Sequence, residues 1–174
     1  MRRNIVSLAA LFFAAVTFVP SATAANPHFK NGGEPVCTIS DPDQTVSCTG
    51  SLAGLGNQNL TVDLTVSGEA TFQCQNKGGN IAPGRNKVPF TSSTSTMFGK
   101  DEIKNGSLTF TVSVVPTAGQ VSGKEAGCPN GNWKAVNGTF TLTGISLVIS
   151  QPPGTTIFTC TASDPTSPVT LTCV

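Results

Sequence analysis

Apolar and polar side chains alternate with a period of two along several segments of this chain. Between residues 60 and 67, Leu or Val occupies every even position, and Thr, Asp or Ser occupies every odd one. Residues 108–114 repeat the pattern, with Leu, Phe or Val at every even position. Because successive side chains of a strand point to opposite faces of a sheet, this alternation predicts two strands that each bury one face.

The region after residue 67 has two interpretations. Residues 70–74 carry a second apolar run at even positions, after the glycine-containing segment 67–69. A hairpin with 67–69 as its loop would place Val66 opposite Ala70 and keep both apolar faces in register. One long strand with a bulge accommodates the same pattern.

The apolar phase slips by one residue in the C-terminal third. Phe140 and Leu142 lie at even positions, whereas the large apolar residues of 145–149 lie at odd positions. The slip falls at Thr143-Gly144. A β-bulge at the glycine would produce it, so the sequence predicts one there.

The N-terminal residues are typical of a secretory signal peptide. Arg2 and Arg3 precede a 15-residue apolar stretch, residues 5–19, and small residues follow Pro20. This stretch is short for a membrane span, which needs about 20 residues. We therefore expect residues 1–25 to be cleaved, residues 26–35 to be flexible, and the remainder to be secreted, either free or loosely associated with the cell envelope. No later segment is apolar enough to predict a transmembrane helix.

The cysteines predict disulfides rather than a metal site. All six follow residue 25: Cys37, Cys48, Cys74, Cys128, Cys160 and Cys173. An even number of cysteines in an exported chain is typical of a disulfide framework. The sequence contains no C-x-x-C pair, and its one histidine, His28, lies in the segment expected to be flexible. We therefore predict no metal and no cofactor.

A local repeat suggests the connectivity. The pattern C-T-x-S-D-P begins at Cys37 and again at Cys160, and each copy precedes a short run that ends in cysteine. Asp-Pro initiates turns, so each segment can fold as a hairpin. These hairpins place Cys37 opposite Cys48 and Cys160 opposite Cys173, on the apolar face and close enough to bridge.

The same hairpins make two further predictions. Ile39 would face Val46, and Ala162 would face Leu171. By elimination, the third disulfide joins Cys74 to Cys128. Other connectivities are not excluded by this argument.

These elements predict an all-β domain over residues 36–174. About eight or nine short antiparallel strands with polar outer faces are typical of a disulfide-stapled, immunoglobulin-like β-sandwich, with a barrel as the second choice. No window shows helical spacing with capping residues. Trp133 follows Cys128, so the Cys-Trp-Cys order of antibody domains is missing and true immunoglobulin membership is not supported.

Composition and charge limit the classes of binding partner that we expect. Charged residues make up 11% of the chain, while threonine alone contributes 24 residues. Without residues 1–25, eight Lys and Arg face nine Asp and Glu. A protein that neutralises many phosphates needs a surplus of positive charge, so nucleic acid is not an expected partner. We expect a monomer.

Two segments without an evident strand pattern are candidate binding loops. They are residues 75–106 and 116–138, and a Cys74–Cys128 disulfide would hold both near one end of the domain. Long loops on a rigid scaffold often carry binding. The candidate surface comprises Arg85, Lys87, Phe90 and Trp133. The alternative is that the aromatic residues pin the loops to the core and that the basic residues are only solvated.

No catalytic constellation is present in the sequence. The carboxylate pairs Asp41/Asp43 and Asp101/Glu102 have simpler roles, in closing a turn and in a solvated charge cluster next to lysines. If all six cysteines are bridged, no thiol nucleophile is left. We therefore name no catalytic residue.

One stretch resembles a group of small exported bacterial proteins of uncharacterised function. It includes S-C-T-G-S-L-A-G-L-G-N from Ser47, the following T-V-x-L-T-V-S-G strand, and C-x-N-x-G-G-N from Cys74. The similarity covers about residues 36–86. It implies export and a β-rich domain, and it assigns no functional residue.

The sequence therefore predicts an exported, non-catalytic module that binds an unidentified protein or glycan. A secreted protease inhibitor that presents the disulfide-tethered loop at Cys128-Pro129 is the alternative. A hydrolase is the third choice.

Overall fold

The computed structural model describes residues 26–174, and the predicted signal peptide lies outside the described residues. This part of the chain folds into eleven β-strands and one short 3-10 helix, η1 (Lys100–Glu102). No helix within it has the length and apolar character that a membrane span requires. The strands form two antiparallel sheets rather than a closed barrel.

The first sheet, sheet A, has five strands. They are β1 (His28–Phe29), β2 (Val36–Ser40), β3 (Thr45–Ala53), β7 (Leu108–Val114) and β10 (Val169–Thr170). The long strand β3 pairs with β7 and with both β2 and β1, and β10 pairs with β2. Strand β3 is therefore the centre of the sheet.

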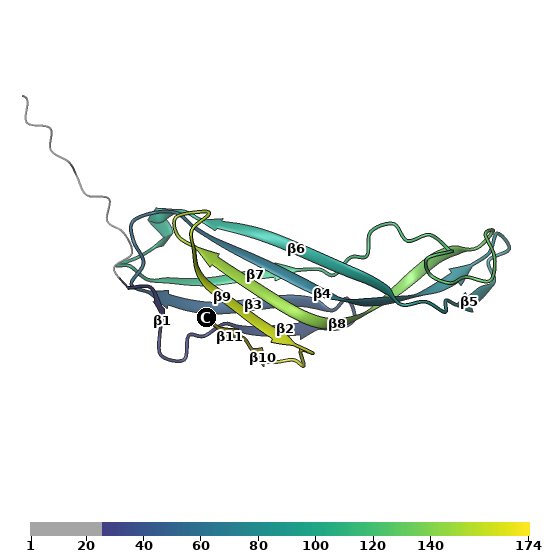
Figure 1. Cartoon of the computed structure of the whole chain (residues 1–174), viewed down its shortest axis with the longest axis horizontal. Helices are drawn as coiled ribbons and strands as arrows, with labels where there is room; N and C mark the ends of the chain where they lie inside the picture. Colours follow the sequence, from purple (N-terminus) through teal and green to yellow (C-terminus); the bar gives the residue numbers. More distant parts are fainter. Residues whose placement is uncertain (1–25) are drawn as a thin grey trace, which may run out of the picture.

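The second sheet, sheet B, has six strands. They are β4 (Leu60–Gln75), β5 (Ile81–Pro83), β6 (Val88–Phe98), β8 (Lys134–Ser150), β9 (Thr156–Ser163) and β11 (Thr172–Cys173). Strand β4 pairs with β8, with β6 along its first part and with β5 at its end, while β9 lies between β8 and β11. The two longest strands, β4 with 16 residues and β8 with 17, link the two ends of the molecule (Figure 1).

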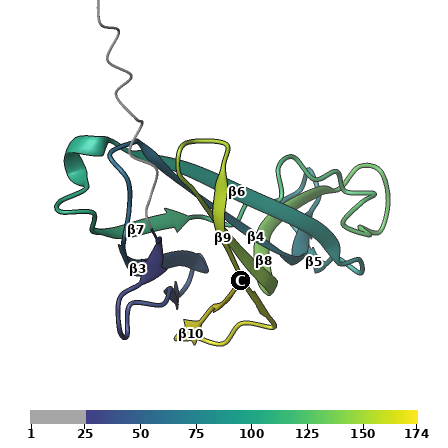
Figure 2. The same ribbon diagram turned by 60° about the vertical axis from the view of Figure 1, so that its left-hand side comes forward.

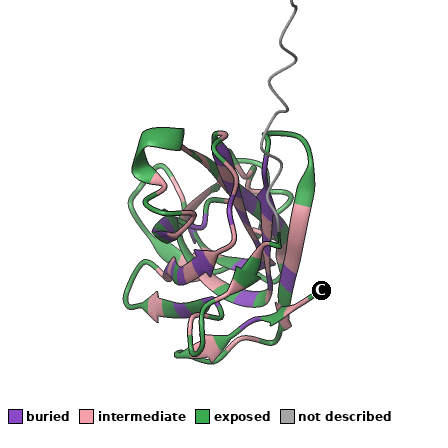
Figure 3. Ribbon diagram, turned by 90° about the vertical axis from the view of Figure 1, so that its left-hand side faces the viewer, coloured by how far each residue is buried: buried purple, intermediate pink, exposed green. Residues whose placement is uncertain are grey.

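Both sheets bury their inward faces in one core. Leu52 and Phe110 from sheet A meet Leu64 and Leu147 from sheet B, and none of these side chains is more than 1% exposed. Seen end-on, the buried stretches lie mainly on the strands, whereas most of the connecting loops are exposed or intermediate (Figure 3). The two packed sheets are the β-sandwich that the alternation predicts, while its immunoglobulin-like character stays a prediction.

The first hairpin has the predicted register. Cys37 pairs with Cys48 and Ile39 with Val46 across β2 and β3. The Cys37–Cys48 disulfide joins residues whose Cα atoms are 4.0 Å apart. The structure also contains the Cys74–Cys128 and Cys160–Cys173 disulfides, which is the pairing that the hairpin argument predicts.

The second hairpin is only partly as predicted. Cys160 pairs with Cys173 in the predicted register, but the pairing with β9 ends at Thr172, and the amide of Leu171 donates to the Pro35 carbonyl over 2.9 Å. The preceding residues form β10, which pairs with β2 in the other sheet. The C-terminal segment therefore crosses between the sheets, because β2 offers it a free edge that a local hairpin cannot reveal. Figure 2 shows β10 at the lower edge of the molecule, close to the C-terminus.

The hairpin proposed at residues 67–69 is wrong, and the long-strand interpretation is correct. The buried alternation runs through Gly68 to Ala70 without a change of phase, so β4 continues. The extra residue is on the partner: Ser67 pairs with Gly144 and Gly68 with Leu142, leaving Thr143 as a bulge. This confirms the bulge predicted at Thr143-Gly144.

The loop prediction for residues 75–106 is wrong, and that for 116–138 extends too far. The first segment contains β5 and the 11-residue β6, and β8 begins at Lys134. The inward face of β6 has Ser92, Thr94 and Thr96 at its centre, so it lacks an apolar alternation. The Ser92 hydroxyl donates to the Thr117 carbonyl at 3.1 Å and accepts from the Thr117 amide at 2.8 Å, which satisfies a buried polar group.

Part of the segment expected to be flexible is paired with sheet A. His28 and Phe29 form β1 against Ala53 and Leu52. The Phe29 ring lies 4.5 Å from that of Phe158 on β9, centroid to centroid, and so joins the two sheets.

One end of the molecule projects beyond the packed sheets. We call it the distal extension and define it as residues 71–86 and 115–138, with the remainder as the body. It contains the end of β4, the start of β8, β5 and the loop before β8 (Figure 1). Every residue of the candidate surface lies in it or just beside it.

Candidate functional site

The distal extension is held together by one disulfide and by backbone hydrogen bonds. Cys74 and Cys128 are bridged with their Cα atoms 5.6 Å apart. The amides of Arg85 and Asn86 both donate to the Ala126 carbonyl, over 3.0 and 3.2 Å. Ala126 and Cys74 are fully buried, yet neither belongs to the continuous apolar core of the body.

The loop before β8 is wound in turns. The amide of Ala126 donates to the Ser122 carbonyl, and that of Cys128 donates to the Gly123 carbonyl. The Glu125 carboxylate accepts from the amide and the hydroxyl of Ser122, over 2.8 and 2.6 Å. These bonds lower the pKa of Glu125, the hydroxyl being the stronger cause.

Trp133 lies at the junction between this loop and β8, half-buried, between two open hollows. Its amide donates to the Asn130 carbonyl over 3.2 Å, which closes the turn that precedes it. One hollow, of about 630 Å³, separates Trp133 from Phe72 on β4. The other, of about 370 Å³, lies towards the turn after β4.

Side-chain amides and one lysine surround Trp133 on each side. The larger hollow includes Gln120, Asn137 and Lys134. The smaller hollow includes Asn76, Asn130, Asn132 and Lys77. Amides supply both hydrogen-bond donors and acceptors, so the two hollows can bind hydroxyl groups on either side of an aromatic surface.

Two of these amides are fixed by their own turns. The Asn76 side-chain oxygen accepts from the amides of Gly78 and Asn80, over 2.9 and 3.0 Å. That of Asn130 accepts from the Asn132 amide over 3.0 Å. Fixed amides lose little conformational freedom when a ligand binds.

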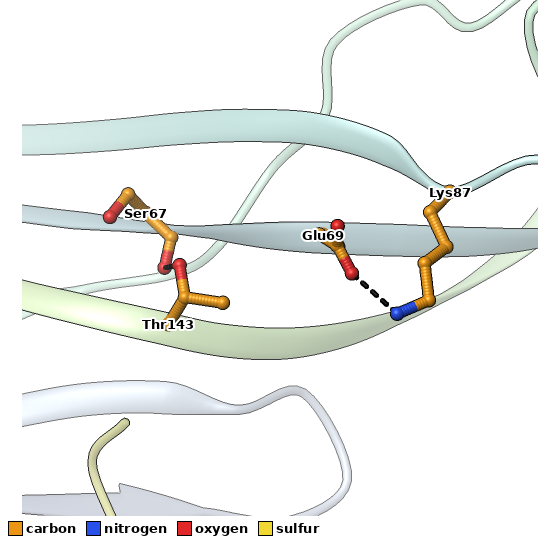
Figure 4. A network of polar contacts seen from close by, with 4 residues as sticks. All are labelled: Ser67, Glu69, Lys87 and Thr143. Atoms are coloured by element: carbon orange, nitrogen blue, oxygen red, sulfur yellow. Dashed lines mark hydrogen bonds and ion pairs between the residues drawn. The ribbon is translucent and has the colours of Figure 1, made fainter. Parts of the chain in front are cut away.

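Arg85 and Lys87 lie at the same end of the molecule but line a different hollow. It has a volume of about 690 Å³ and includes Glu125. Lys87 is engaged in an ion pair, because its Nζ lies 2.7 Å from Glu69 Oε2 (Figure 4). Both partners are exposed, with side chains 68% and 41% accessible, so this pair contributes little stability.

Phe90 is part of the core rather than of the surface. It is only 6% exposed and packs edge-to-face on Phe140, with ring centroids 5.1 Å apart. The structure therefore separates the four residues of the candidate surface. Trp133 lies between two hollows, Arg85 and Lys87 line a third, and Phe90 is buried.

The residues that the sequence reasoning missed are the amides and lysines around Trp133. They are Asn76, Lys77, Gln120, Asn130, Asn132, Lys134 and Asn137. Their only signal in the sequence is the high density of asparagine in the residues that follow Cys74 and Cys128, and asparagine is equally typical of turns.

The candidate carboxylates close turns in the structure. Asp41 accepts from the Gln44 side chain over 2.6 Å, and Asp43 accepts from the hydroxyl of Thr45 over 2.8 Å. The Thr45 hydroxyl, and then the Thr45 amide, lower the pKa of Asp43. Glu102 accepts from the Gly99 amide over 2.6 Å. Within residues 26–174, no group of three His, Cys, Asp or Glu side chains is arranged to hold a metal ion.

No family model, curated protein or solved structure matches this chain. The function must therefore be argued from the geometry of the distal extension.

Proposed function

We propose that this protein is an exported, non-catalytic module that binds a glycan at Trp133. The observation that carries the proposal is the position of the indole between two hollows lined by side-chain amides. One face of a sugar ring is rich in C–H bonds, which carry partial positive charge and pack on the negative face of an aromatic ring. The hydroxyls at the ring's edge can then exchange hydrogen bonds with the amides on both sides.

Export is supported by the N-terminal signal pattern and by the disulfides. All six cysteines of the chain are bridged in the structure. Such bonds persist in oxidising compartments and are rare in the cytosol. Outside the cell or in its envelope, polysaccharides are abundant and fixed in place, which suits a small binding module.

A glycan fits this surface better than a protein partner does. Protein interfaces have a contiguous apolar centre. The exposed large hydrophobic residues of the described chain are Val36, Ile81, Met97, Val115 and Val174, and they lie on five different segments. Only Ile81 and Val115 fall within the distal extension, and neither lines the hollows beside Trp133.

The protease-inhibitor alternative gains no support from the loop. An inhibitor would need an extended, exposed segment to enter a protease cleft. Residues 122–128 are instead wound in successive turns, and Ala126 is fully buried.

The experiment uses the only tryptophan of a chain that has no tyrosine. Intrinsic emission therefore reports Trp133 alone. We expect a spectral shift that saturates when the disulfide-intact protein is titrated with a binding oligosaccharide from a panel of neutral and acidic glycans. Calorimetry should then show at least tenfold weaker binding by Trp133→Ala and a smaller loss for Trp133→Phe, which keeps an aromatic face.

The control is Met97→Ala. Met97 is 60% exposed on the body, so its loss should leave binding unchanged. Equal affinity of Trp133→Ala and the wild-type protein would refute the proposal, as would an emission spectrum that no member of the panel alters.

A further inference from the structure

Charge is distributed unevenly between the distal extension and the body. The extension contains four Lys and Arg side chains and one carboxylate, that of Glu125. The other described residues contain four Lys and Arg and eight Asp and Glu. Although the net charge of residues 26–174 is close to zero, the distal extension is basic and the body is acidic.

The basic residues nearest Trp133 are not paired with carboxylates. Lys134 lines the larger hollow and Lys77 the smaller one, and neither hollow includes an Asp or Glu. Among residues 26–174, the only ion pair joins Lys87 to Glu69, at the edge of the body. Both lysines are exposed and are available to a ligand.

The positions of these two lysines matter as much as the number of basic residues. One lysine lies on each side of the indole, on segments that meet only in the folded protein: Lys77 follows β4 and Lys134 begins β8. A ligand at Trp133 that extends into both hollows therefore meets one lysine in each of them. An anionic ligand that occupies both hollows would be attracted by both lysines.

We propose that the glycan bound at Trp133 carries fixed negative charge, as carboxylate or phosphate groups, which Lys77 and Lys134 contact. This inference rests on the proposed glycan-binding function and adds the ligand class to it. The amides hold the hydroxyls, the indole holds a ring face, and the lysines select polysaccharides whose sugars are acidic.

Single-stranded nucleic acid shares this chemistry but fits less well. Proteins that bind it stack successive bases on several aromatic side chains along a basic groove. Among the residues that line the two hollows beside Trp133, Phe72 is the only other aromatic side chain, and it is half-buried. The secreted chain as a whole also has no surplus of positive charge to neutralise a run of phosphates.

The test compares two ligands that differ in charge and in one methyl group on each carboxylate. One is an oligogalacturonate and the other is its neutral methyl ester, each titrated into the disulfide-intact protein. We expect the acid to bind at least tenfold more tightly at low salt and to lose most of this advantage in about 0.5 M salt, where screening is strong. A phosphate-bearing mannan oligosaccharide in a parallel titration shows whether carboxylate or phosphate is preferred.

The matched variants separate local from general charge effects. Lys77→Ala combined with Lys134→Ala should weaken binding of the acidic ligand about tenfold and leave the methyl ester unaffected. Lys30→Ala combined with Lys104→Ala removes two exposed cations of the body, so it should change neither affinity. Far-ultraviolet circular dichroism of each double variant checks that it is folded.

The outcomes distinguish the two proposals. Equal binding of acid and ester, with dependence on Trp133 retained, would overturn the inference on charge and leave the glycan-binding function standing. Tighter binding of a single-stranded oligonucleotide than of every acidic glycan would overturn the inference in favour of nucleic acid. If no glycan binds at all, both proposals fail.

Discussion

The body and the distal extension of this protein are stabilised in different ways. In the body, inward side chains of both sheets form a continuous core, and two disulfides join residues that already face each other in neighbouring strands. In the extension, the buried apolar side chains are only Cys74, Pro116 and Ala126, and one disulfide joins residues 54 positions apart. The body is held by apolar burial, whereas the extension is held by a cross-link and by turns.

This difference bears on the proposed function. A surface that binds a polar ligand, as we propose for the extension, cannot also bury its polar groups in a core. The disulfide and the turn hydrogen bonds let the extension hold asparagine, lysine and tryptophan side chains at the surface without an apolar core beneath them. The body supplies the stability, and the extension supplies the exposed chemistry.

The largest effect should come from the core of the body. Phe110 is 1% exposed and lies 6.5 Å from the Phe98 ring, centroid to centroid. We expect Phe110→Ala to lower the free energy of unfolding by about 3–5 kcal/mol, through lost apolar burial and the cavity left behind. Urea denaturation measures this change in the free energy of unfolding. A loss below about 1 kcal/mol would show that the body does not depend on its core in this way.

The next effect should separate the two regions directly. Replacing Cys74 and Cys128 by alanine removes the closure of the longest loop, a contribution of at most about 4 kcal/mol in the chain-entropy model. We expect hydrogen exchange to accelerate over residues 71–86 and 115–138, while β3 and β7 remain protected. The reason is that the extension has little apolar burial to replace the bond.

The matched control is the double alanine variant of Cys37 and Cys48. Its shorter loop corresponds to about 3 kcal/mol in the same model. Here we expect faster exchange throughout sheet A rather than in the extension. Loss of protection across the whole molecule in the Cys74/Cys128 variant would show instead that the two regions unfold as one unit.

A smaller effect is expected from adding a methyl group where the body is tightly packed. A Cβ at Gly68 would collide with the Thr141 carbonyl oxygen and lie 2.9 Å from the Phe90 ring. Gly68→Ala should therefore cost about 1–3 kcal/mol. In the extension, a Cβ at Gly131 has no neighbour within 4 Å, so Gly131→Ala should change stability by less than about 0.5 kcal/mol. Equal losses, measured by thermal unfolding, would contradict the difference in packing.

The smallest effect concerns pH and involves one carboxylate in each region. The pKa values of Asp43 in the body and Glu125 in the extension are lowered from their ordinary 3.8 and 4.5 by hydrogen bonds from Thr45 and Ser122. A carboxylate with a lowered pKa stabilises the fold above its unfolded-state pKa, and this stability is lost as the pH falls through the folded value. Melting temperatures should therefore decrease below about pH 4.

The decrease should be less steep in Asp43→Asn and in Glu125→Gln than in the wild-type protein. Because both groups are fully exposed, the differences should be small. Identical pH profiles for the wild-type protein and both variants would show that these hydrogen bonds do not act on stability.

The local alternation of apolar and polar residues predicted the structure correctly wherever one face of a strand is apolar. The alternation from Leu60 and the phase slip at Thr143 predicted strands and a bulge that the structure confirms. The first hairpin was predicted to the residue, because its turn, its apolar pair and its cysteines all give the same register. These signals are local, and each can be read without knowing what lies across the core.

The sequence pattern predicted the structure poorly where the segment that pairs with or packs on a strand is far away in the sequence. Strand β6 has Ser92 at its inward centre, and only the segment after β7, which brings Thr117 to it, makes this position favourable. The second hairpin was predicted to close on itself along its whole length, whereas only β11 pairs with β9 and β10 joins β2. The candidate surface was predicted from loop length, and Phe90, on β6, turned out to be buried.

The sequence by itself determined the all-β class, the strands with one apolar face and the local hairpin pairs, because a period of two and an Asp-Pro turn act within a few residues. Only the tertiary structure decided that the C-terminal strand crosses between sheets and that amides and lysines from three distant segments surround Trp133. The physical reason is that strand edges and loop ends meet through long-range pairing. Which strand edges and loop ends meet is set by the packing of the whole core and not by the local sequence of the segments that pair.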